Sequence, residues 1–265
     1  MFALSPYSHT IFGFIMRFFS MRFSYKSLTT VCLIFCVQVS PILSFQQNLD
    51  SLKSLLRAEQ AHLRSDSATI SLLNRLSQEY RSRNADSSLK YALEALERSE
   101  KIGFTSGLGA ALINLGNIYR NLGDYNRALG FLQRALTVGE QSKNIPLTGQ
   151  AWNGIGIVYL RQGSLDRALD ALLKALRISE QVRDARGEAS ALDNLGVVHI
   201  RQGNTVRAFQ ALHRALHLTD SLHDKRLRSI VLNDLGIAYR TEKHFDSALV
   251  VYKQSLVLKE QLKDK

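Results

Sequence analysis

Residues 112–136 read LINLGNIYRNLGDYNRALGFLQRAL, and a related stretch returns at residues 152–176 as WNGIGIVYLRQGSLDRALDALLKAL. Two further copies follow at residues 192–216 and 232–256, so the sequence repeats every 40 residues. The step preserves small, aromatic and leucine positions: Gly116, Gly156, Gly196 and Gly236; Tyr119, Tyr159, His199 and Tyr239; Gly123, Gly163 and Gly203; Ala128, Ala168, Ala208 and Ala248; Leu136, Leu176, Leu216 and Leu256. A period of this length indicates a solenoid or another array of stacked units.

Each copy reads as two helices joined by a tight turn. Small residues such as Gly116 and Ala128 let two helices approach closely, while Tyr119 and the leucines fill the space between them. Gly123 can take the left-handed conformation that ends a helix, and Asp124 or Asn204 can cap the next one. The repeating unit is therefore predicted to be an antiparallel helix pair.

These residues resemble the tetratricopeptide repeat in its lengthened, 40-residue form, as found in Pins-type and kinesin-light-chain scaffolds. Trp152 stands at the family's characteristic tryptophan position, and the Gly, Tyr, Gly, Ala and Ala positions follow it in order. The resemblance implies an all-α fold, a right-handed α-solenoid of antiparallel helix pairs.

A fifth, degenerate copy precedes the four clear ones, if one residue is missing from its turn near Asn84 and Ala85. Leucines on one helical stripe before it, from Leu49 to Leu63, suggest a capping helix. The predicted organisation is a signal peptide at 1–44, a capping helix at 45–65, and five repeats at 66–265. Their approximate bounds are 66–105, 106–145, 146–185, 186–225 and 226–265.

The stretches LKSLL, SLLNRLSQEY and SLKYALEALERSEKIG, from residue 52 to 103, are also similar to another group of proteins. They resemble the extracytoplasmic tetratricopeptide region of Bacteroidetes-type sensor histidine kinases and LuxR-type regulators. In those families similar repeats precede a membrane helix and an output domain.

The N-terminal segment resembles a Sec signal peptide. From Met21 it reads MRFSYK, then SLTTVCLIFCVQV, then SPILS: a basic start, an apolar run and a small-residue exit. The true start is then Met21 or Met16, and an uncleaved segment would anchor the chain in the inner membrane. Cys32 and Cys36, the only cysteines of the chain, lie in the apolar run, so a cleaved protein has no thiol chemistry.

The net charge of +11 does not identify a nucleic-acid ligand. Its basic residues are scattered, apart from a stripe on the second helices: Arg127, Arg167, Arg207, Arg134, Lys174 and Arg214. We interpret that stripe as a solvated face with local acidic partners; an acidic-lipid or nucleic-acid surface is the alternative. The pattern predicts no specific nucleic-acid partner.

No catalytic or cofactor motif accompanies the repeats. Gly154-Ile155-Gly156 lacks the third glycine and the strand of a dinucleotide site. His213 and His217 are four residues apart without a third ligand, and His199 reads as a core histidine with a satisfied ring nitrogen, a pH switch being the alternative. We therefore predict no enzyme activity, no cofactor and no metal.

The family resemblance implies that the first helix of each pair lines a concave groove. Carrying its groove positions onto this chain selects polar residues: Asn117, Arg120, Asn121, Asn153, Arg161, Asp193, Arg201, Asn233 and Arg240. Amides and guanidiniums between the short apolar side chains of Ile113, Ile157, Val197 and Ile237 suit a peptide or protein partner. The clamp used by chaperone-binding members is not reproduced.

The last repeat departs from the others at its second helix. Positions that are Gly130, Asp170 and Gln210 earlier become Val250, and the Thr137, Arg177 and His217 position becomes Val257. With Leu258 and Leu262, which have no following repeat to pack on, these residues predict an apolar C-terminal surface. Either a second copy in a symmetric dimer or a segment lost by truncation would cover it.

Together these observations predict an exported scaffold or sensory adaptor, periplasmic or secreted, that binds a protein or peptide in its groove. The alternative is the truncated sensor region of a histidine kinase or LuxR-type regulator. The membrane enters either interpretation only through an uncleaved signal segment.

Overall fold

The computed structural model describes residues 49–56, 66–81 and 83–262. The chain divides after Ser51 into two units, and the second unit, from Leu52 onward, contains the repeats. The predicted signal peptide, both cysteines and residues 57–65 of the predicted capping helix lie outside the described residues. Residues 49–56 form a helix, and the structure describes only this part of the 45–65 segment.

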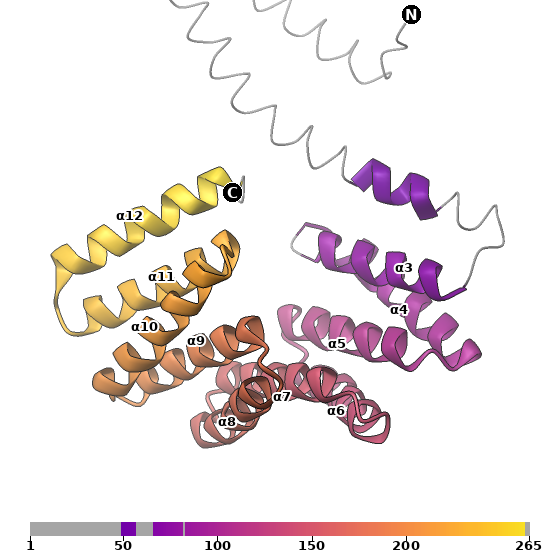
Figure 1. Ribbon diagram of the computed structural model, residues 1–265, viewed down its shortest axis with the longest axis horizontal. Coiled ribbons are helices and arrows are strands. Elements are labelled where there is room, and N and C mark those ends of the chain that lie inside the picture. The colour runs from indigo at the N-terminus through magenta and orange to yellow at the C-terminus, as the bar shows by residue number, and fades with distance from the viewer. Residues whose placement is uncertain (1–48, 57–65, 82, 263–265) are drawn as a thin grey trace, which may run out of the picture. The chain divides into compact units, whose positions relative to one another are not determined.

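Within the described residues the repeats form five consecutive helix pairs, coloured from indigo to yellow in Figure 1. The pairs are α3 (Asp66–Tyr80) with α4 (Ala85–Ile102), α5 (Thr105–Asn121) with α6 (Tyr125–Gln141), α7 (Ile145–Arg161) with α8 (Leu165–Val182), α9 (Ala185–Arg201) with α10 (Thr205–Ser221), and α11 (Lys225–Thr241) with α12 (Phe245–Gln261). The all-α array of antiparallel pairs predicted from the sequence is confirmed. The first helices α5, α7, α9 and α11 each begin one residue before the predicted repeat boundary.

The turn inside each pair follows the predicted glycine chemistry. Gly123, Gly163 and Gly203 have φ of 81°, 79° and 74°, in the left-handed region that glycine enters without a steric cost. Lys243 stands at the equivalent point of the last pair with φ of 63°. The predicted caps are confirmed, because the side chains of Asp124 and Asn204 accept hydrogen bonds from backbone N–H groups of α6 and α10.

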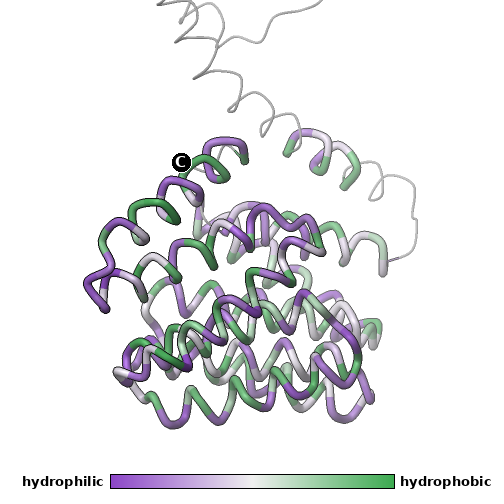
Figure 2. The backbone as a smooth tube through the Cα atoms, turned by 60° about the vertical axis from the view of Figure 1, so that its left-hand side comes forward, coloured by the Kyte–Doolittle hydropathy of each residue, from purple (hydrophilic) through white to green (hydrophobic). Residues whose placement is uncertain are grey.

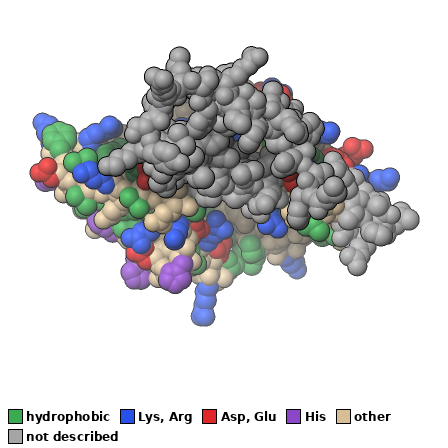
Figure 3. Space-filling model, turned by 90° about the horizontal axis from the view of Figure 1, so that it is seen from above, with side chains coloured by type: hydrophobic (Ala, Val, Ile, Leu, Met, Phe, Trp, Pro, Cys, Tyr) green, Lys and Arg blue, Asp and Glu red, His purple; other side chains and the backbone are tan. Residues whose placement is uncertain are grey.

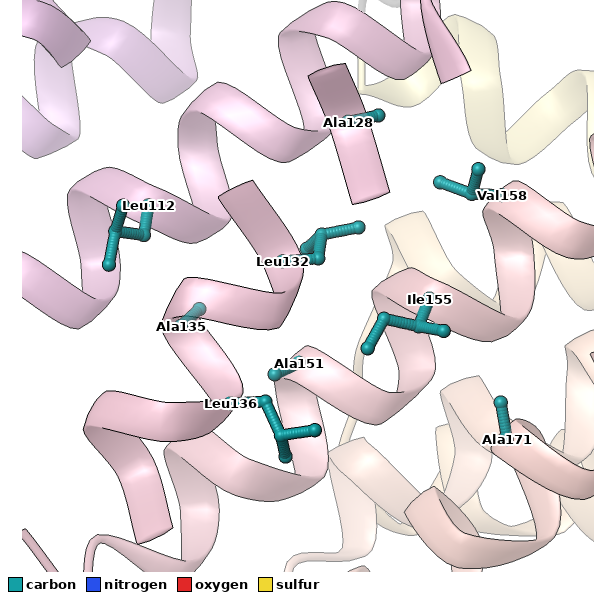
Figure 4. Packing of buried hydrophobic residues seen from close by; sticks show 9 residues of the cluster. All are labelled: Leu112, Ala128, Leu132, Ala135, Leu136, Ala151, Ile155, Val158 and Ala171. Carbon is teal, nitrogen blue, oxygen red and sulfur yellow. The ribbon is translucent and has the colours of Figure 1, made fainter. Parts of the chain in front are cut away.

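The core lies between the two helices of each pair and between successive pairs. Leu112, Leu132 and Ile155, with the alanines beside them, form one such cluster across α5, α6, α7 and α8 (Figure 4). Fully burying a leucine such as Leu132 contributes ~1.5–3 kcal/mol. Gly116 allows this packing, because a Cβ atom there would lie 2.6 Å from Leu132 Cγ. Because one side of each helix is buried, hydrophobic and hydrophilic residues alternate along the helices, as Figure 2 shows.

Successive first helices pack on one another, α3 on α5, α5 on α7, α7 on α9 and α9 on α11. The backbones of the second helices approach only the first helices of their own and the following pair. Ion pairs such as Arg134 with Glu100 link successive second helices through their side chains. The first helices therefore approach each other more closely and form the inner layer of the array, as Figure 1 shows. None of the helices in the described part of the chain is long and apolar enough to cross a bilayer.

Candidate partner-binding face

We call the surface formed by the first helices α3, α5, α7, α9 and α11 the first-helix face. It carries the residues predicted to line the groove. Hydrogen bonds link successive first helices across it in what we call rungs. In one rung the Asn114 amide donates to the Asn74 side-chain oxygen over 3.1 Å, and in another Asn194 donates to Asn153 over 3.3 Å. Asn153 also donates to Ser190 Oγ over 3.3 Å. The predicted residue Asn153 thus forms part of a link between α7 and α9.

The rung between α9 and α11 contains two carboxyl groups instead of two amides. Asp193 is only 5% exposed, and its Oδ1 has no hydrogen-bond partner among the residues that the structure describes. Burial, and then the charge of Asp234, raise the pKa of Asp193 well above its ordinary value. Burial also raises the pKa of Asp234, although a hydrogen bond from Asn233 and the charges of Lys259 and Arg161 oppose this shift. Asp193, predicted as a groove residue, is therefore enclosed rather than presented to solvent.

Arginines at the ends of the first three first helices form a second feature, the arginine row, defined as Arg81, Arg120 and Arg161. Burial and the charges of its two neighbours lower the pKa of Arg120 to about 10. Burial, and then the charge of Arg226 at the start of α11, lower the pKa of Arg81. No ion pair found among residues 49–56, 66–81 and 83–262 involves any member of the row.

Such a row of like charges favours an anionic group that could approach it, because each guanidinium offers paired N–H donors to a carboxylate or phosphate. Sequence reasoning selected Arg120 and Arg161 but missed Arg81. The signal was present: Tyr80-Arg81 repeats the order of Tyr119-Arg120, in the copy that has lost its turn glycine.

The remaining predicted residues divide between links within the array and exposed groups. Arg201 donates to the Leu160 carbonyl over 2.8 Å, and Asn121 accepts a hydrogen bond from Arg120 over 3.3 Å. Arg240 is exposed and Asn117 is half-buried. A cavity of about 310 Å³ opens between α7, α8 and α9, and Asn153 and Ser190 are among its lining residues.

Four of the six residues in the basic stripe have acidic partners in the described structure, as interpreted from the sequence; Arg127 pairs with Asp124. Arg134 pairs with Glu100 at 2.8 Å, Lys174 with Asp170 at 2.8 Å, and Arg214 with Glu180 at 2.7 Å. Where Figure 3 shows coloured side chains, Lys and Arg lie interspersed with Asp, Glu and His.

Histidines and acids do not assemble a metal site in the described residues, where no three His, Cys, Asp or Glu side chains gather. His213 stacks on the ring of Phe209. The Nδ1 atom of His199 lies 3.2 Å from Gln202 Oε1, so one ring nitrogen of His199 has a partner.

The second helix of the last pair has an exposed apolar face. Val250 and Val257 are 54% and 50% exposed. Leu258 and Leu262 are half-buried. The structure adds residues that sequence reasoning did not select: Phe245, Leu249 and Leu256, all more than half exposed. Each earlier second helix packs against the following first helix, and no described helix occupies that place next to α12.

The sequence matches the tetratricopeptide repeat family in four overlapping windows, residues 67–141, 107–181, 147–221 and 187–261. These windows span nearly all of the repeat region. The chain belongs to the tetratricopeptide repeat family. No curated protein sequence matches it.

Three solved structures show how far this fold is shared with other tetratricopeptide arrays. BtubC (BKLC) from P. vanneervenii is 18% identical with a TM-score of 0.61, covering 85% of this chain and 92% of its own. A Rap protein complexed with competence and sporulation factor is 16% identical with a TM-score of 0.62, over 85% and 74%. A putative kinesin light chain from Podosopora anserina is 13% identical with a TM-score of 0.53, over 76% and 100%. At these identities the likeness concerns the fold alone.

Proposed function

We propose that this tetratricopeptide array is a non-catalytic scaffold that holds an acidic segment of a protein or peptide partner on its first-helix face. The arginine row carries this proposal. Arg120 lies within electrostatic reach of both Arg81 and Arg161. No ion pair within the described residues involves any of the three. Carboxylates of a partner would supply the missing charge through two parallel hydrogen bonds each.

Neighbouring groups on the same face suit a polypeptide. The half-buried Asn117 and Ile157 lie on the first helices that carry the row, so an amide and an apolar side chain are available beside the charges. An amide can pair with a partner's backbone, and an apolar side chain excludes water from such contacts. A Rap protein with a similar fold has been solved in complex with competence and sporulation factor, which supports a binding role for an array of this kind.

The proposal includes export from the cytoplasm, into the periplasm or the medium. Its support is the basic and apolar pattern that begins at Met21. Fractionation of the native cells should recover a protein that has lost the residues up to about Ser44. Full-length protein in the cytosol, with Phe2 still attached, would contradict export and leave the binding proposal to its own test.

The rival function is the sensor region of a histidine kinase or LuxR-type regulator, suggested by the resemblance of residues 52–103. Genomic DNA downstream of the Lys265 codon distinguishes the two. A membrane helix in the same frame beyond a stop codon or frameshift would favour the sensor.

The binding proposal is tested with two matched triple variants. Arg81→Gln, Arg120→Gln and Arg161→Gln together remove the row. Arg127→Gln, Arg167→Gln and Arg207→Gln remove the same charge from exposed positions on three second helices. An oligoglutamate peptide and an oligolysine peptide serve as probes in fluorescence anisotropy.

We expect the wild type and the second-helix variant to bind oligoglutamate, more weakly as salt is added, and the row variant to lose this binding. Helicity should remain unchanged in the second-helix variant, because exposed substitutions usually alter stability by no more than ~0.5 kcal/mol. Arg81 and Arg120 are half-buried, so circular dichroism must show that the row variant is folded before its binding is compared. Equal losses in the two variants would reduce the effect to net charge and contradict a specific role for the row.

A further inference from the structure

The rungs of the first-helix face pair groups that can hydrogen-bond, except at the last one. In the Asn74–Asn114 and Asn153–Asn194 rungs an amide N–H donates to the opposite amide oxygen. One repeat after Asn153 and Asn194, the same two positions hold Asp193 and Asp234. Two ionised carboxylates offer only acceptors, so this rung cannot form a hydrogen bond unless one of them is protonated.

The surroundings of the acidic rung decide which carboxyl carries a proton. Asp193 on α9 is near enough to Asp234 for its charge to raise the pKa of Asp193, and its buried Oδ1 has no hydrogen bond within the described part of the chain. Asp234 accepts a hydrogen bond from Asn233 over 3.1 Å, and the cations Arg161 of α7 and Lys259 of α12 face it. These contacts favour the ionised form of Asp234. The neutral form is favoured at Asp193, where an ionised group would be buried without a partner.

We propose that Asp193 and Asp234 share one proton. The packing of α9 on α11 is then stable at low pH and weakens as pH rises, whereas the amide rungs do not depend on pH. With the proton, the rung has a donor and an acceptor. Without it, two negative charges face each other in a buried place. The proposal concerns packing of the array. It shares Arg161 with the arginine row, but its tests change only Asp193, Asn153 and Asn194, so it can fail without the partner-binding proposal failing.

The sign of the pH dependence follows from the direction of the pKa shifts. Both carboxyl groups have folded-state pKa values raised above the ordinary 3.8. A group shifted in this direction stabilises the fold fully below its unfolded pKa, and that stabilisation is lost as pH rises through the folded pKa. The α9–α11 contact should therefore weaken from about pH 4 upward.

Thermal unfolding of the full chain, followed by circular dichroism between about pH 4 and pH 8, tests this behaviour. The wild-type Tm should fall as pH rises, and it should fall more steeply than the Tm of Asp193→Asn. That variant replaces the proton by an amide donor, so its Tm should depend less on pH and exceed the wild-type Tm at the upper end. An unchanged pH slope in Asp193→Asn would overturn the proposal.

The amide rung provides a matched control in the same chain. Asn153→Asp with Asn194→Asp should create a second acid-dependent rung and steepen the fall of Tm. Asn194→Asp alone retains the Asn153 donor and should not. Equal pH slopes for the single and double variants would contradict the role of facing carboxylates.

Carbon-13 NMR of the aspartate carboxyl groups tests the proposal on the wild-type protein, so the result does not depend on whether a variant folds. The Asp193 signal should titrate well above the ordinary range of an aspartate. An ordinary titration of both Asp193 and Asp234 would refute the shared proton.

Discussion

Gly156→Ala should destabilise this protein, although alanine is the better helix former. Gly156 lies inside α7, and a Cβ atom there would approach Leu172 Cγ to 2.6 Å, Leu172 Cδ2 to 2.8 Å and the Leu172 backbone nitrogen to 3.3 Å. Leu172 is fully buried, so it has little space to move away. Overpacking of this kind costs ~1–3 kcal/mol, and the gain in helix propensity offsets about 1 kcal/mol of it. The net loss in the free energy of unfolding should be ~1 kcal/mol.

Gly130→Ala is the matched control. Gly130 lies inside α6, and a Cβ atom there meets nothing within 4 Å, so only the gain in helix propensity applies. In a domain of this size, about 1 kcal/mol corresponds to ~2–4 °C in Tm. Thermal unfolding should show Gly156→Ala melting below the wild type and Gly130→Ala melting above it.

A double-mutant cycle locates the cause at Leu172. In a Leu172→Ala background, which itself costs ~2–5 kcal/mol, the obstruction is gone and Gly156→Ala should become stabilising. If Gly156→Ala raises Tm like Gly130→Ala, or keeps the same effect in the Leu172→Ala background, the close approach of α7 and α8 is not what the glycine provides.

Two further predictions concern the last pair. Lys243→Gly should stabilise the last pair by up to about 1 kcal/mol, because Lys243 holds a left-handed φ of 63° where earlier turns have glycine. Slower hydrogen exchange in α11 and α12 would show this, and faster exchange would contradict it. Val250→Glu with Val257→Glu should abolish self-association seen by sedimentation velocity if a second copy covers α12; a wild-type monomer would remove the basis for the proposed dimer.

The fold could be predicted because the residues that recur every 40 positions determine the turns and helix ends next to them in the sequence. Glycine at positions 123, 163 and 203 dictates a left-handed turn, and Asp124 and Asn204 can cap only the helix that follows them. Copies in register then leave little choice of architecture. The absence of glycine at Lys243 did not change the turn, because the packing of α11 on α12 maintains the backbone conformation there.

The arrangement across the first-helix face could not be predicted from the period alone. Asp193 was selected because its position lines the groove in the family, but Asp234, whose charge raises its pKa, lies 41 residues further on, one more than the period. Asn153 and Asn194 have the same offset. It arises from how neighbouring first helices pack side by side, which the repeat period does not specify. Arg81 was missed for a different reason: it follows Tyr80, the last residue of α3, in the degenerate first copy that has lost its turn glycine.

We propose that a partner lies on the first-helix face, and photo-crosslinking in the native cells can show this in place. A photoreactive amino acid replaces Asn117 on α5 in one strain and the exposed Gln133 on the second helix α6 in another. We expect a discrete crosslinked partner from position 117 that disappears with Arg81→Gln, Arg120→Gln and Arg161→Gln, and none from position 133. A partner crosslinked only from position 133, or one from position 117 that survives loss of the three arginines, would contradict binding to the first-helix face through the arginine row.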